Sequence, residues 1–157
     1  MAEPITYSID TSALIHGWHR AYRPRNFGFV WNRLDALITE GRIKLSIEAL
    51  HELEKKEDDL FKWCKVRSNA FVVDITEDCQ LKVIHIMGKY PRLVDTVKGR
   101  SAADPFVIAL ASTTSPAMMV ISEEQSGKTR IPDVCNSEGI QCKFFADLIE
   151  IENWQFF

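Results

Sequence analysis

Short apolar runs of strand-forming residues alternate along the chain with segments of helical periodicity. The runs are residues 5–9, 43–46, 118–121 and 140–144, and residues 71–73 form a weaker run that we expect to lead into a helix instead. Helices are expected over residues 12–16, 27–39, 47–56, 59–66, 76–89, 105–111 and 146–149. Strands separated by helices pair in parallel, because each helix returns the chain to the edge where the previous strand began. This alternation predicts an α/β fold with a mostly parallel sheet.

The length of 157 residues is enough for a single domain, residues 1–157, with a substantial apolar core. The net charge of −3 gives no general attraction to nucleic acid, so such a partner would need a local basic surface. No apolar run approaches the roughly 20 residues of a membrane span, and the N-terminal residues lack the features of a secretory signal. The 4 cysteines form no C-x-x-C pair, which argues against zinc and for reduced thiols. We therefore expect a cytoplasmic protein with no membrane partner.

Acidic residues stand at the ends of the predicted strands or near the beginnings of the helices that follow. They are Asp10, Glu48, Glu52, Asp104, Glu123 and Glu124. Strand ends and helix beginnings share one edge of a parallel sheet, which is also where such sheets bind ligands, so these carboxylates can converge. Asp10 has a second interpretation, because Asp, Thr and Ser in this position also serve as ordinary helix N-caps. Periodicity does not choose between Glu48 and Glu52, since both lie off the apolar stripe of their helix.

A set of converging carboxylates has a specific chemical consequence. Three or four of them in one cleft would repel one another and resist ionisation unless a cation were bound. Ligands that are all oxygen select a hard cation, Mg²⁺ or Mn²⁺, rather than zinc. One or two such ions lower the pKa of a bound water molecule and stabilise both oxygens of an in-line phosphodiester displacement. The acidic set therefore predicts metal-dependent hydrolysis that needs no Ser–His or Cys–His pair.

Basic residues near the predicted cleft provide candidates for a local RNA-binding surface. They are Arg20, Arg23, Arg25, Lys98, Arg100, Lys128 and Arg130. The first three belong to a predicted loop, residues 16–25, whose mixture of aromatic and basic side chains suits base stacking with phosphate contacts. An ordinary solvated loop is the other interpretation. His16 and His19 have H-x-x-H spacing, but no longer zinc signature accompanies them.

Four short motifs resemble, in their order along the chain, the successive motifs of the PIN domain. They are Asp10-Thr11-Ser12, Ser46 followed by Glu52-Leu53, the run A-A-D-P-F-V-I-A-L-A around Asp104, and V-I-S-E-E at Glu124. Within that superfamily, the I-P-D-V-C segment at residues 131–135 is similar to an uncharacterised subfamily of VapC-like toxins. The resemblance spans nearly the whole chain. It implies a three-layer α/β/α sandwich with a central, mostly parallel sheet of four to five strands.

The resemblance also implies an activity and a set of site residues. Members of the family are endoribonucleases that depend on Mg²⁺ or Mn²⁺, and many bacterial members are dimeric toxins silenced by an antitoxin protein. Carried over by position, the catalytic and metal-binding residues are Asp10, Ser12, Glu52, Asp104 and Glu124, with Ser12 matching the hydroxyl residue that positions the metal-bound water. Spacing after Ser122 favours Glu124 over Glu123, although the family often has Asp there. Asp133 is either an outer ligand or a turn residue beside Pro132.

The alternative class of function is a PIN-like module that binds RNA or a protein without cutting. It predicts a broken carboxylate set, whereas this chain has an acid at each of the four motifs.

Two smaller expectations concern packing. His85 is expected at the core edge of its helix, on one face with Leu81 and Ile84, and the aromatic tail of residues 154–157 is expected to pack on the protein's own core.

Overall fold

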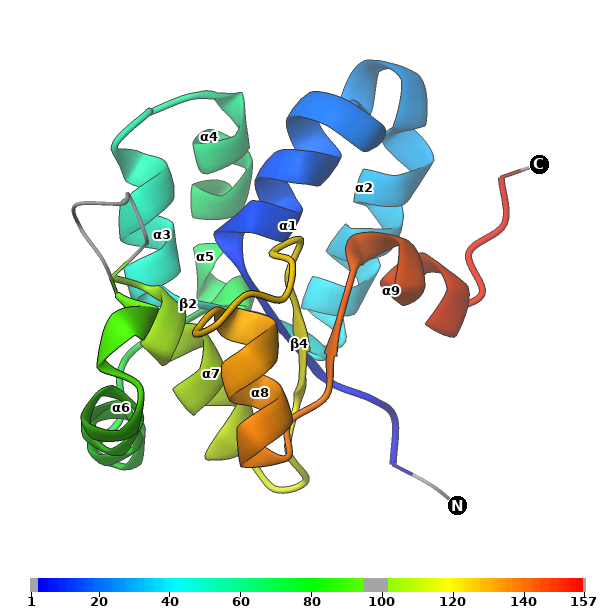
Figure 1. Cartoon of the computed structure of the whole chain (residues 1–157). Coiled ribbons are helices and arrows are strands. Elements are labelled where there is room, and N and C mark those ends of the chain that lie inside the picture. The colour runs from blue at the N-terminus through cyan, green and yellow to red at the C-terminus, as the bar shows by residue number, and fades with distance from the viewer. Residues whose placement is uncertain (1–2, 95–101, 157) are drawn as a thin grey trace.

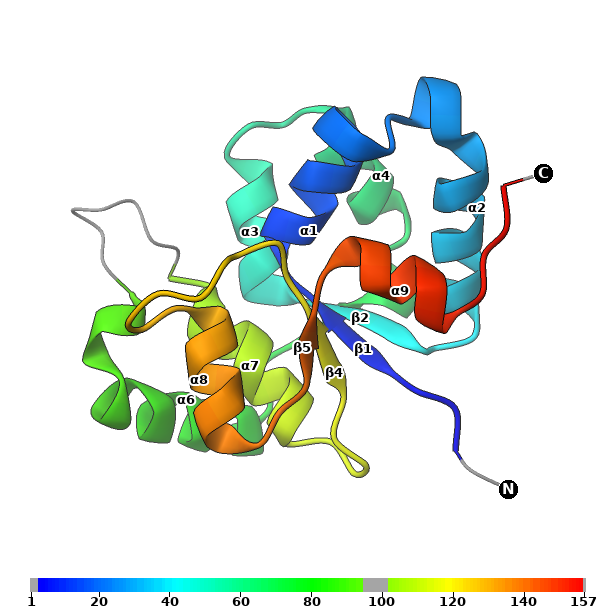
Figure 2. The same cartoon turned by 45° about the vertical axis from the view of Figure 1, so that its right-hand side comes forward.

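The computed structural model describes residues 3–94 and 102–156, so the predicted basic residues Lys98 and Arg100 lie outside the described residues. Its strands are β1 (Tyr7–Ile9), β2 (Ile43–Ser46), β3 (Val72–Val73), β4 (Met119–Ile121) and β5 (Cys142–Lys143). They form a 5-stranded sheet in the order β3-β2-β1-β4-β5, and all neighbouring strands are parallel. Figure 2 labels four of these strands, β2, β1, β4 and β5, in the middle of the molecule. The predicted α/β class and its parallel sheet are confirmed.

Side chains of the central strands alternate between the two faces of the sheet, and this alternation divides the core into two parts. Tyr7 and Ile9 of β1 belong to one apolar cluster. Ser8 between them faces the other side, where its hydroxyl donates a hydrogen bond to the carbonyl oxygen of Val107 at 2.9 Å. Val120 of β4 also belongs to that second cluster. Because both faces are buried, the strands read in the sequence as nearly continuous apolar runs.

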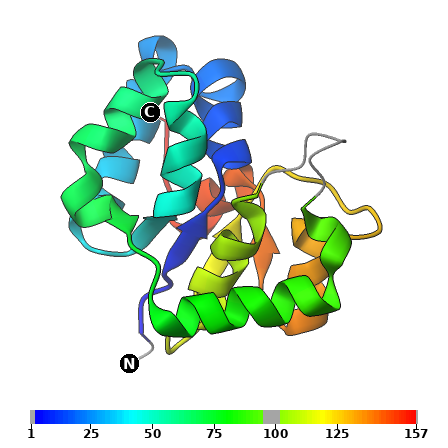
Figure 3. The ribbon, with the colours of Figure 1, turned by 90° about the vertical axis from the view of Figure 1, so that its left-hand side faces the viewer.

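Helices cover both faces of the sheet, as Figure 1 and Figure 3 show. One face carries α1 (Thr11–His16), the π-helical turn η1 (Gly17–Ala21), α2 (Pro24–Thr39), α3 (Ile47–Glu54), α4 (Asp59–Val66), α5 (Ser68–Phe71) and α9 (Phe145–Ile151). The other carries α6 (Glu77–Lys89), the 3₁₀ turn η2 (Pro91–Leu93), α7 (Asp104–Ser112) and α8 (Ile131–Glu138). This is the expected three-layer α/β/α sandwich. In the part of the chain that the structure describes, no helix has the length and apolar character needed to cross a bilayer.

Residues 16–25 are mostly helical, which corrects the prediction of a loop. α1 continues through η1 as far as Ala21, and α2 begins at Pro24. The helix runs close to the core at Gly17, where an added Cβ would lie 3.0 Å from Cε2 of Phe145. Trp18 packs edge-on against Trp31 with ring centroids 4.8 Å apart. These tertiary contacts hold a helix that the mixed local composition did not indicate.

Helix α6 is present as predicted, but with its faces exchanged. Thr76 is its N-cap and accepts a hydrogen bond from the backbone N–H of Cys79 at 3.1 Å. Leu81 and Ile84 are 59% and 69% exposed, and the side chain of His85 is 54% exposed, so their expected position at the core is wrong. Cys79 and Ile86, on the other side of the helix, are buried instead. Both faces carry apolar residues at helical spacing, so periodicity alone does not identify the face that meets the sheet.

Two further expectations have opposite outcomes. Val72 and Val73 form the edge strand β3, which pairs in parallel with Leu45 and Ser46, so the expectation that this run is not a strand is wrong, although the predicted helix follows it as α6. The short α5 before them brings the chain to this edge. A run this short forms a strand here because it pairs with β2, not because its own length favours one. The expected packing of the aromatic tail on the protein's own core holds for Trp154, which is buried in the cluster that contains β1, whereas Phe156 is 49% exposed and Phe157 lies outside the described residues.

Candidate active site

A cavity of about 910 Å³ opens at the carboxyl edge of the sheet, beside the beginnings of α1 and α7 and along α3. Its acidic lining residues are Asp10, Glu48, Glu52, Asp58, Asp104 and Glu124. Its basic and hydroxyl lining residues are His51, Lys55, Lys56, Arg130, Thr11 and Ser12. The four acids implied by the PIN resemblance therefore lie in one cavity. They meet because the strand ends and helix beginnings that carry them share one edge of the sheet.

Asp10 lies directly after β1 and is 2% exposed. Its backbone occupies the N-cap position of α1, but among the described residues its side chain makes no capping hydrogen bond. Oδ2 instead accepts hydrogen bonds from the hydroxyls of Ser12 at 2.5 Å and Ser122 at 3.1 Å. Oδ1 is buried and has no hydrogen-bond partner within the described part of the chain. The ordinary N-cap interpretation of this side chain is therefore wrong, and one carboxylate oxygen is available for a ligand.

Ser122 is a residue of the site that sequence reasoning missed. It follows β4, is 1% exposed, and its hydroxyl lies 3.2 Å from the Ser12 hydroxyl. The same hydroxyl accepts a hydrogen bond from the backbone N–H of Glu124 at 3.2 Å, and Ser12 accepts one from the backbone N–H of Glu123 at 3.0 Å. The two serines thus join the ends of β1 and β4 around Asp10. The available signal was a small hydroxyl residue between a strand end and two acids.

Replacing Ser122 with alanine is expected to lower the free energy of unfolding by about 1 kcal/mol. The substitution removes one hydrogen-bond donor to the buried Asp10 carboxylate and one acceptor of the Glu124 N–H. Urea denaturation near neutral pH measures the change. Ser126→Ala is the matched control, because Ser126 is exposed in the same loop and its loss should change stability by less than about 0.5 kcal/mol. Equal stability of the two variants would show that the hydroxyl pair does not support the site.

Both candidate glutamates of α3 line the cavity, but their surroundings differ. Oε1 of Glu52 accepts a hydrogen bond from the Thr11 hydroxyl at 2.9 Å, which joins α3 to the beginning of α1. The charge of Glu52 also acts on Asp10 across the cavity. The side chain of Glu48 is 33% exposed and lies 3.9 Å from Nδ1 of His51 on the same helix. Position therefore favours Glu52 as the inner acid and Glu48 as an outer one.

The two adjacent glutamates that follow β4 face different surroundings. Glu124 lines the cavity, with Oε1 lying 3.5 Å from Nη2 of Arg130. Its Oε2 accepts a hydrogen bond from the backbone N–H of Ile131 at 3.3 Å. Oε1 of Glu123 accepts one from the backbone N–H of Phe145, at the beginning of α9, at 3.0 Å. The structure thus places Glu124 in the cavity, as its spacing after the strand indicates, and turns Glu123 towards α9.

Asp133 holds the beginning of α8 in place. Its Oδ2 accepts hydrogen bonds from the backbone N–H groups of Gly127 and Arg130, both at 2.9 Å. This is the turn role that was one of its two interpretations, and it leaves the outer-ligand role without support. The same contacts keep Arg130 beside the cavity.

Burial and mutual repulsion raise the pKa values of the inner carboxylates. Burial is the largest cause of the raised pKa of Asp10, of Glu52 and of Asp104. The pKa of Asp104 is raised further by the negative charges of Asp10 and Glu124, while the positive charge of Arg130 lowers it. The cavity therefore gathers negative charge where water cannot solvate it well. Such an environment favours the binding of a cation.

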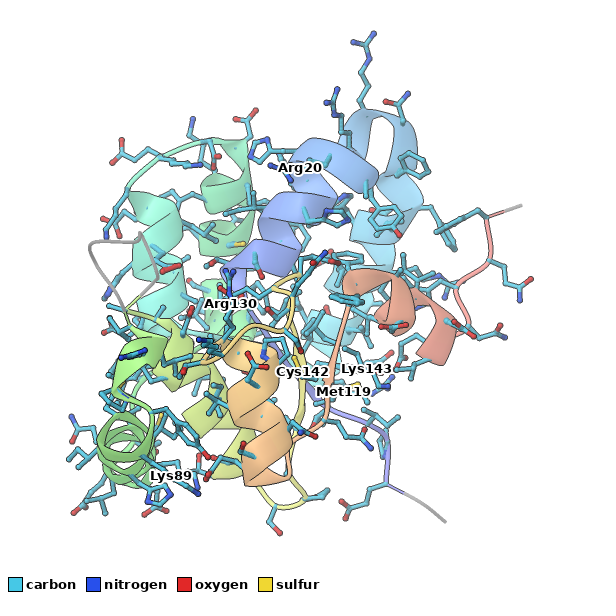
Figure 4. All side chains as sticks on the ribbon, viewed as in Figure 1. Arg20, Lys89, Met119, Arg130, Cys142 and Lys143 are labelled. Atoms are coloured by element: carbon cyan, nitrogen blue, oxygen red, sulfur yellow. The ribbon has the colours of Figure 1, made fainter. Side chains whose placement is uncertain are left out.

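The predicted substrate-binding residues separate into two groups. Of the described candidates, Arg130 lines the cavity, whereas Arg20, Arg23, Arg25 and Lys128 are not part of its described lining. Figure 4 shows Arg130 near the start of α1 and Arg20 towards the far end of that helical segment. The structure does not bring the residues of 20–25 to the cavity because α1 and η1 carry them away from the sheet. Nε of Arg130 is buried and has no hydrogen-bond partner among the described residues.

The two histidines with H-x-x-H spacing contact different acids. Nε2 of His16 lies 3.9 Å from Oε1 of Glu123, and Nε2 of His19 lies 3.2 Å from Oδ2 of Asp58. In the described part of the structure the two rings therefore face different acids.

The carboxylates fit a hard divalent cation by their chemistry, although their side chains are not arranged around a common point. Oxygen-only donors, one of them the free Oδ1 of Asp10, suit Mg²⁺ or Mn²⁺. Within the described ranges, however, no group of three or more His, Cys, Asp or Glu side chains is placed to hold a metal ion. Three of the four acids are turned towards a local donor, Asp10 towards Ser12, Glu52 towards Thr11 and Glu124 towards Arg130. Mutual repulsion opposes a closer arrangement unless a cation compensates the charge.

The fold and the cavity together define an α/β protein with an acidic site at the carboxyl edge of a parallel sheet. A family model described as "Domain of unknown function (DUF4411)" matches residues 7–156. The chain therefore belongs to this family. A comparison with curated proteins found no match. Membership of the family assigns no chemistry, so the function has to be argued from the cavity itself.

Proposed function

We propose that this protein is a metal-dependent endoribonuclease of the PIN-domain type, which hydrolyses RNA phosphodiester bonds with one or two Mg²⁺ or Mn²⁺ ions. The observation that carries the proposal is a pair of buried polar atoms without hydrogen-bond partners among the described residues, Oδ1 of Asp10 and Nε of Arg130. Both residues line the same cavity. A free acceptor suits a cation and a free donor suits an anion, so a phosphate together with a divalent cation would satisfy both.

Each residue of the cavity has a role in this proposal. The acids that would hold the cation are Asp10, Glu52, Asp104 and Glu124. When bound, the cation supplies charge neutralisation, activation of an attacking water molecule and stabilisation of charge on the phosphodiester oxygens. Arg130 orients the phosphate, because among the described residues its Nε has no hydrogen-bond partner and its guanidinium has a single ion pair to give up, the 3.5 Å contact with Glu124. Ser12 fixes the orientation of the Asp10 carboxylate through the hydrogen bond to Oδ2.

We extend the proposal to the biological setting of a toxin–antitoxin pair. The substrate is then cellular RNA, the partner is a cognate antitoxin protein, and a homodimer is the expected assembly. This extension rests on the order of the four PIN-like motifs and on the I-P-D-V-C segment. The 4 cysteines are free thiols, which suits the reducing cytoplasm as the place of action. A small gene for a DNA-binding antitoxin beside this one would support the extension directly.

The non-cutting PIN-like module is the alternative that the proposal has to exclude. Such a module needs no intact acid set and no carboxylate oxygen kept free in a buried position. In this protein Asp10 and Asp104 are each 2% exposed in the cavity. Burying two carboxylates, with Oδ1 of Asp10 left without a hydrogen-bond partner among the described residues, is unfavourable for stability, so their retention is better explained by a cation that they bind during catalysis.

RNA cleavage by the purified protein tests the proposal. With Mn²⁺ present, end-labelled RNA is expected to be cut internally, excess EDTA is expected to stop the reaction, and added Mn²⁺ is expected to restore it. Denaturing gels resolve the fragments. Cleavage that persists in EDTA would contradict the metal-dependent mechanism, whereas RNA binding without any cleavage would support the inactive module.

A further inference from the structure

The cavity of the proposed nuclease has cations on two sides as well as carboxylates. Arg130 enters it from the loop before α8, while Lys55 and Lys56 enter it from the turn that follows α3. Figure 1 and Figure 2 show the end of α3 and the beginning of α8 as separate segments with the start of α1 between them. An extended polyanion could therefore contact cations on both sides while its central part lies over the acids.

The side chains of Lys55 and Lys56 are available to a ligand. Both residues are exposed, and within the described part of the chain the side chain of neither takes part in a hydrogen bond or an ion pair. Lys55 acts on Glu52 only through its charge, which lowers the pKa of that carboxyl against the larger effect of burial. Elsewhere Lys82 and Lys89 each form an ion pair with Glu138 at 3.1 Å, so they serve the fold. Among the described residues, Lys55 and Lys56 form no comparable ion pair that would hold two parts of the fold together.

The backbone that carries these lysines is well defined. The N–H of Lys55 donates to the carbonyl oxygen of Glu52 at 3.3 Å, and the N–H of Lys56 donates to that of Leu53 at 3.2 Å. Glu57 then adopts a left-handed conformation with φ 46°. After it, Asp58 caps α4 by accepting a hydrogen bond from the N–H of Phe61 at 3.0 Å. Because the turn is fixed at both ends, less conformational entropy is lost when the lysines bind a ligand.

We propose that Lys55 and Lys56 bind RNA phosphates on the side of the cavity opposite Arg130, so that one strand is held across the acids by contacts on both sides of the cut. This inference rests on the proposed nuclease function. Lysine at the end of a helix also interacts favourably with the helix dipole, which would explain Lys55 but not the position of Lys56 beside the same cavity. The negative charge of the acids makes such contacts necessary, because a polyanion would otherwise be repelled.

The salt dependence of RNA binding tests this role. Affinity for a fluorescent oligouridylate is measured by anisotropy in Mn²⁺ over a range of salt concentrations, in an Asp104→Asn background that prevents cleavage. Lys55→Ala and Lys56→Ala are each expected to weaken binding and to reduce the slope of log affinity against log salt by about 0.7, and the double variant by about twice that. Lys143→Ala is the matched control, since Lys143 is exposed on β5 beyond the cavity lining among the described residues and is labelled in Figure 4.

The outcomes distinguish this inference from the nuclease proposal. An unchanged slope in the double variant, or an equal loss in Lys143→Ala, would overturn the role of the two lysines even if the wild-type protein cleaves RNA. The expected slopes together with no cleavage by the wild-type protein would keep the RNA-binding role and remove the nuclease function. Displacement of RNA binding in favour of an acidic peptide, with the same lysines required, would assign the surface to a protein partner and overturn the inference. Circular dichroism melting checks that every variant is folded.

Discussion

Asparagine in place of Asp104 is expected to reduce the rate of RNA cleavage by about 100-fold or more while the protein stays folded. Asp104 begins α7 and is 2% exposed, and its charge and that of Asp10 repel each other across the cavity. Asparagine keeps the size of the side chain but removes the negative charge that would hold a cation. Asp10→Asn is expected to have the same effect, because Oδ1 of Asp10 is the carboxylate oxygen left free. Initial rates across a range of Mn²⁺ concentrations measure both losses.

Glu123→Gln is the matched control for these two substitutions. Glu123 is adjacent to Glu124, but its carboxylate accepts a hydrogen bond from the backbone N–H of Phe145 at 3.0 Å. Glutamine retains an oxygen acceptor for that contact while losing the charge, so cleavage should stay close to the wild-type rate. Full activity in Asp104→Asn, or an equal loss in Glu123→Gln, would contradict the assignment of the metal-binding acids.

The same Asp104→Asn variant is expected to be more stable than the wild-type protein by roughly 2 kcal/mol when both are free of metal, at about pH 8. Burial, followed by the charges of Asp10 and Glu124, raises the pKa of Asp104 in the folded protein. The ionised carboxylate is therefore unfavourable in the fold, and the neutral amide avoids this effect. Urea denaturation in EDTA measures the difference. A variant that is less stable than wild type would show that the Asp104 carboxylate supports the fold rather than straining it.

The dependence of stability on pH follows from the same raised pKa. Above the ordinary carboxylate pKa of about 4, Asp104 holds its proton more tightly in the folded protein than in the unfolded chain, so its contribution to the free energy of unfolding falls as the pH rises. The Asp104 contribution to this loss should extend from about pH 5 past neutral pH and be absent in Asp104→Asn. Comparing the two proteins at each pH isolates this one group from the rest of the chain. At alkaline pH, Mn²⁺ should restore the stability of wild type and have much less effect on the variant.

Much of the fold was predictable because it depends on signals within a few residues of each element. Asp58 caps α4 through the N–H of Phe61, and Ser46 caps α3 through the N–H of Glu48. Gly41 ends α2 in the left-handed conformation with φ 74°, which glycine adopts without steric cost. Such contacts are local, so they can be read directly from the order of the residues.

The exposed face of α6 was not predictable in this way. Leu81 and Ile84 have the spacing of a buried stripe, and so do Cys79 and Ile86 on the other side of the helix. Which stripe is buried depends on the direction from which α6 meets α7, two elements separated along the chain by residues 90–103. The helical turn η1 was missed for a related reason, because its packing partner Phe145 lies far away in the sequence.

The sequence by itself determined the alternation of strands and helices, and it placed Asp10 and Asp104 at the ends of elements that meet at one edge of a parallel sheet. Only the tertiary structure decided that the Ser122 hydroxyl turns to Asp10, and that Arg130 rather than Arg20 accompanies the acids. The physical reason is that strand and helix formation depends on neighbouring residues. The direction of a side chain at the end of an element depends instead on donors and acceptors brought to it by remote segments.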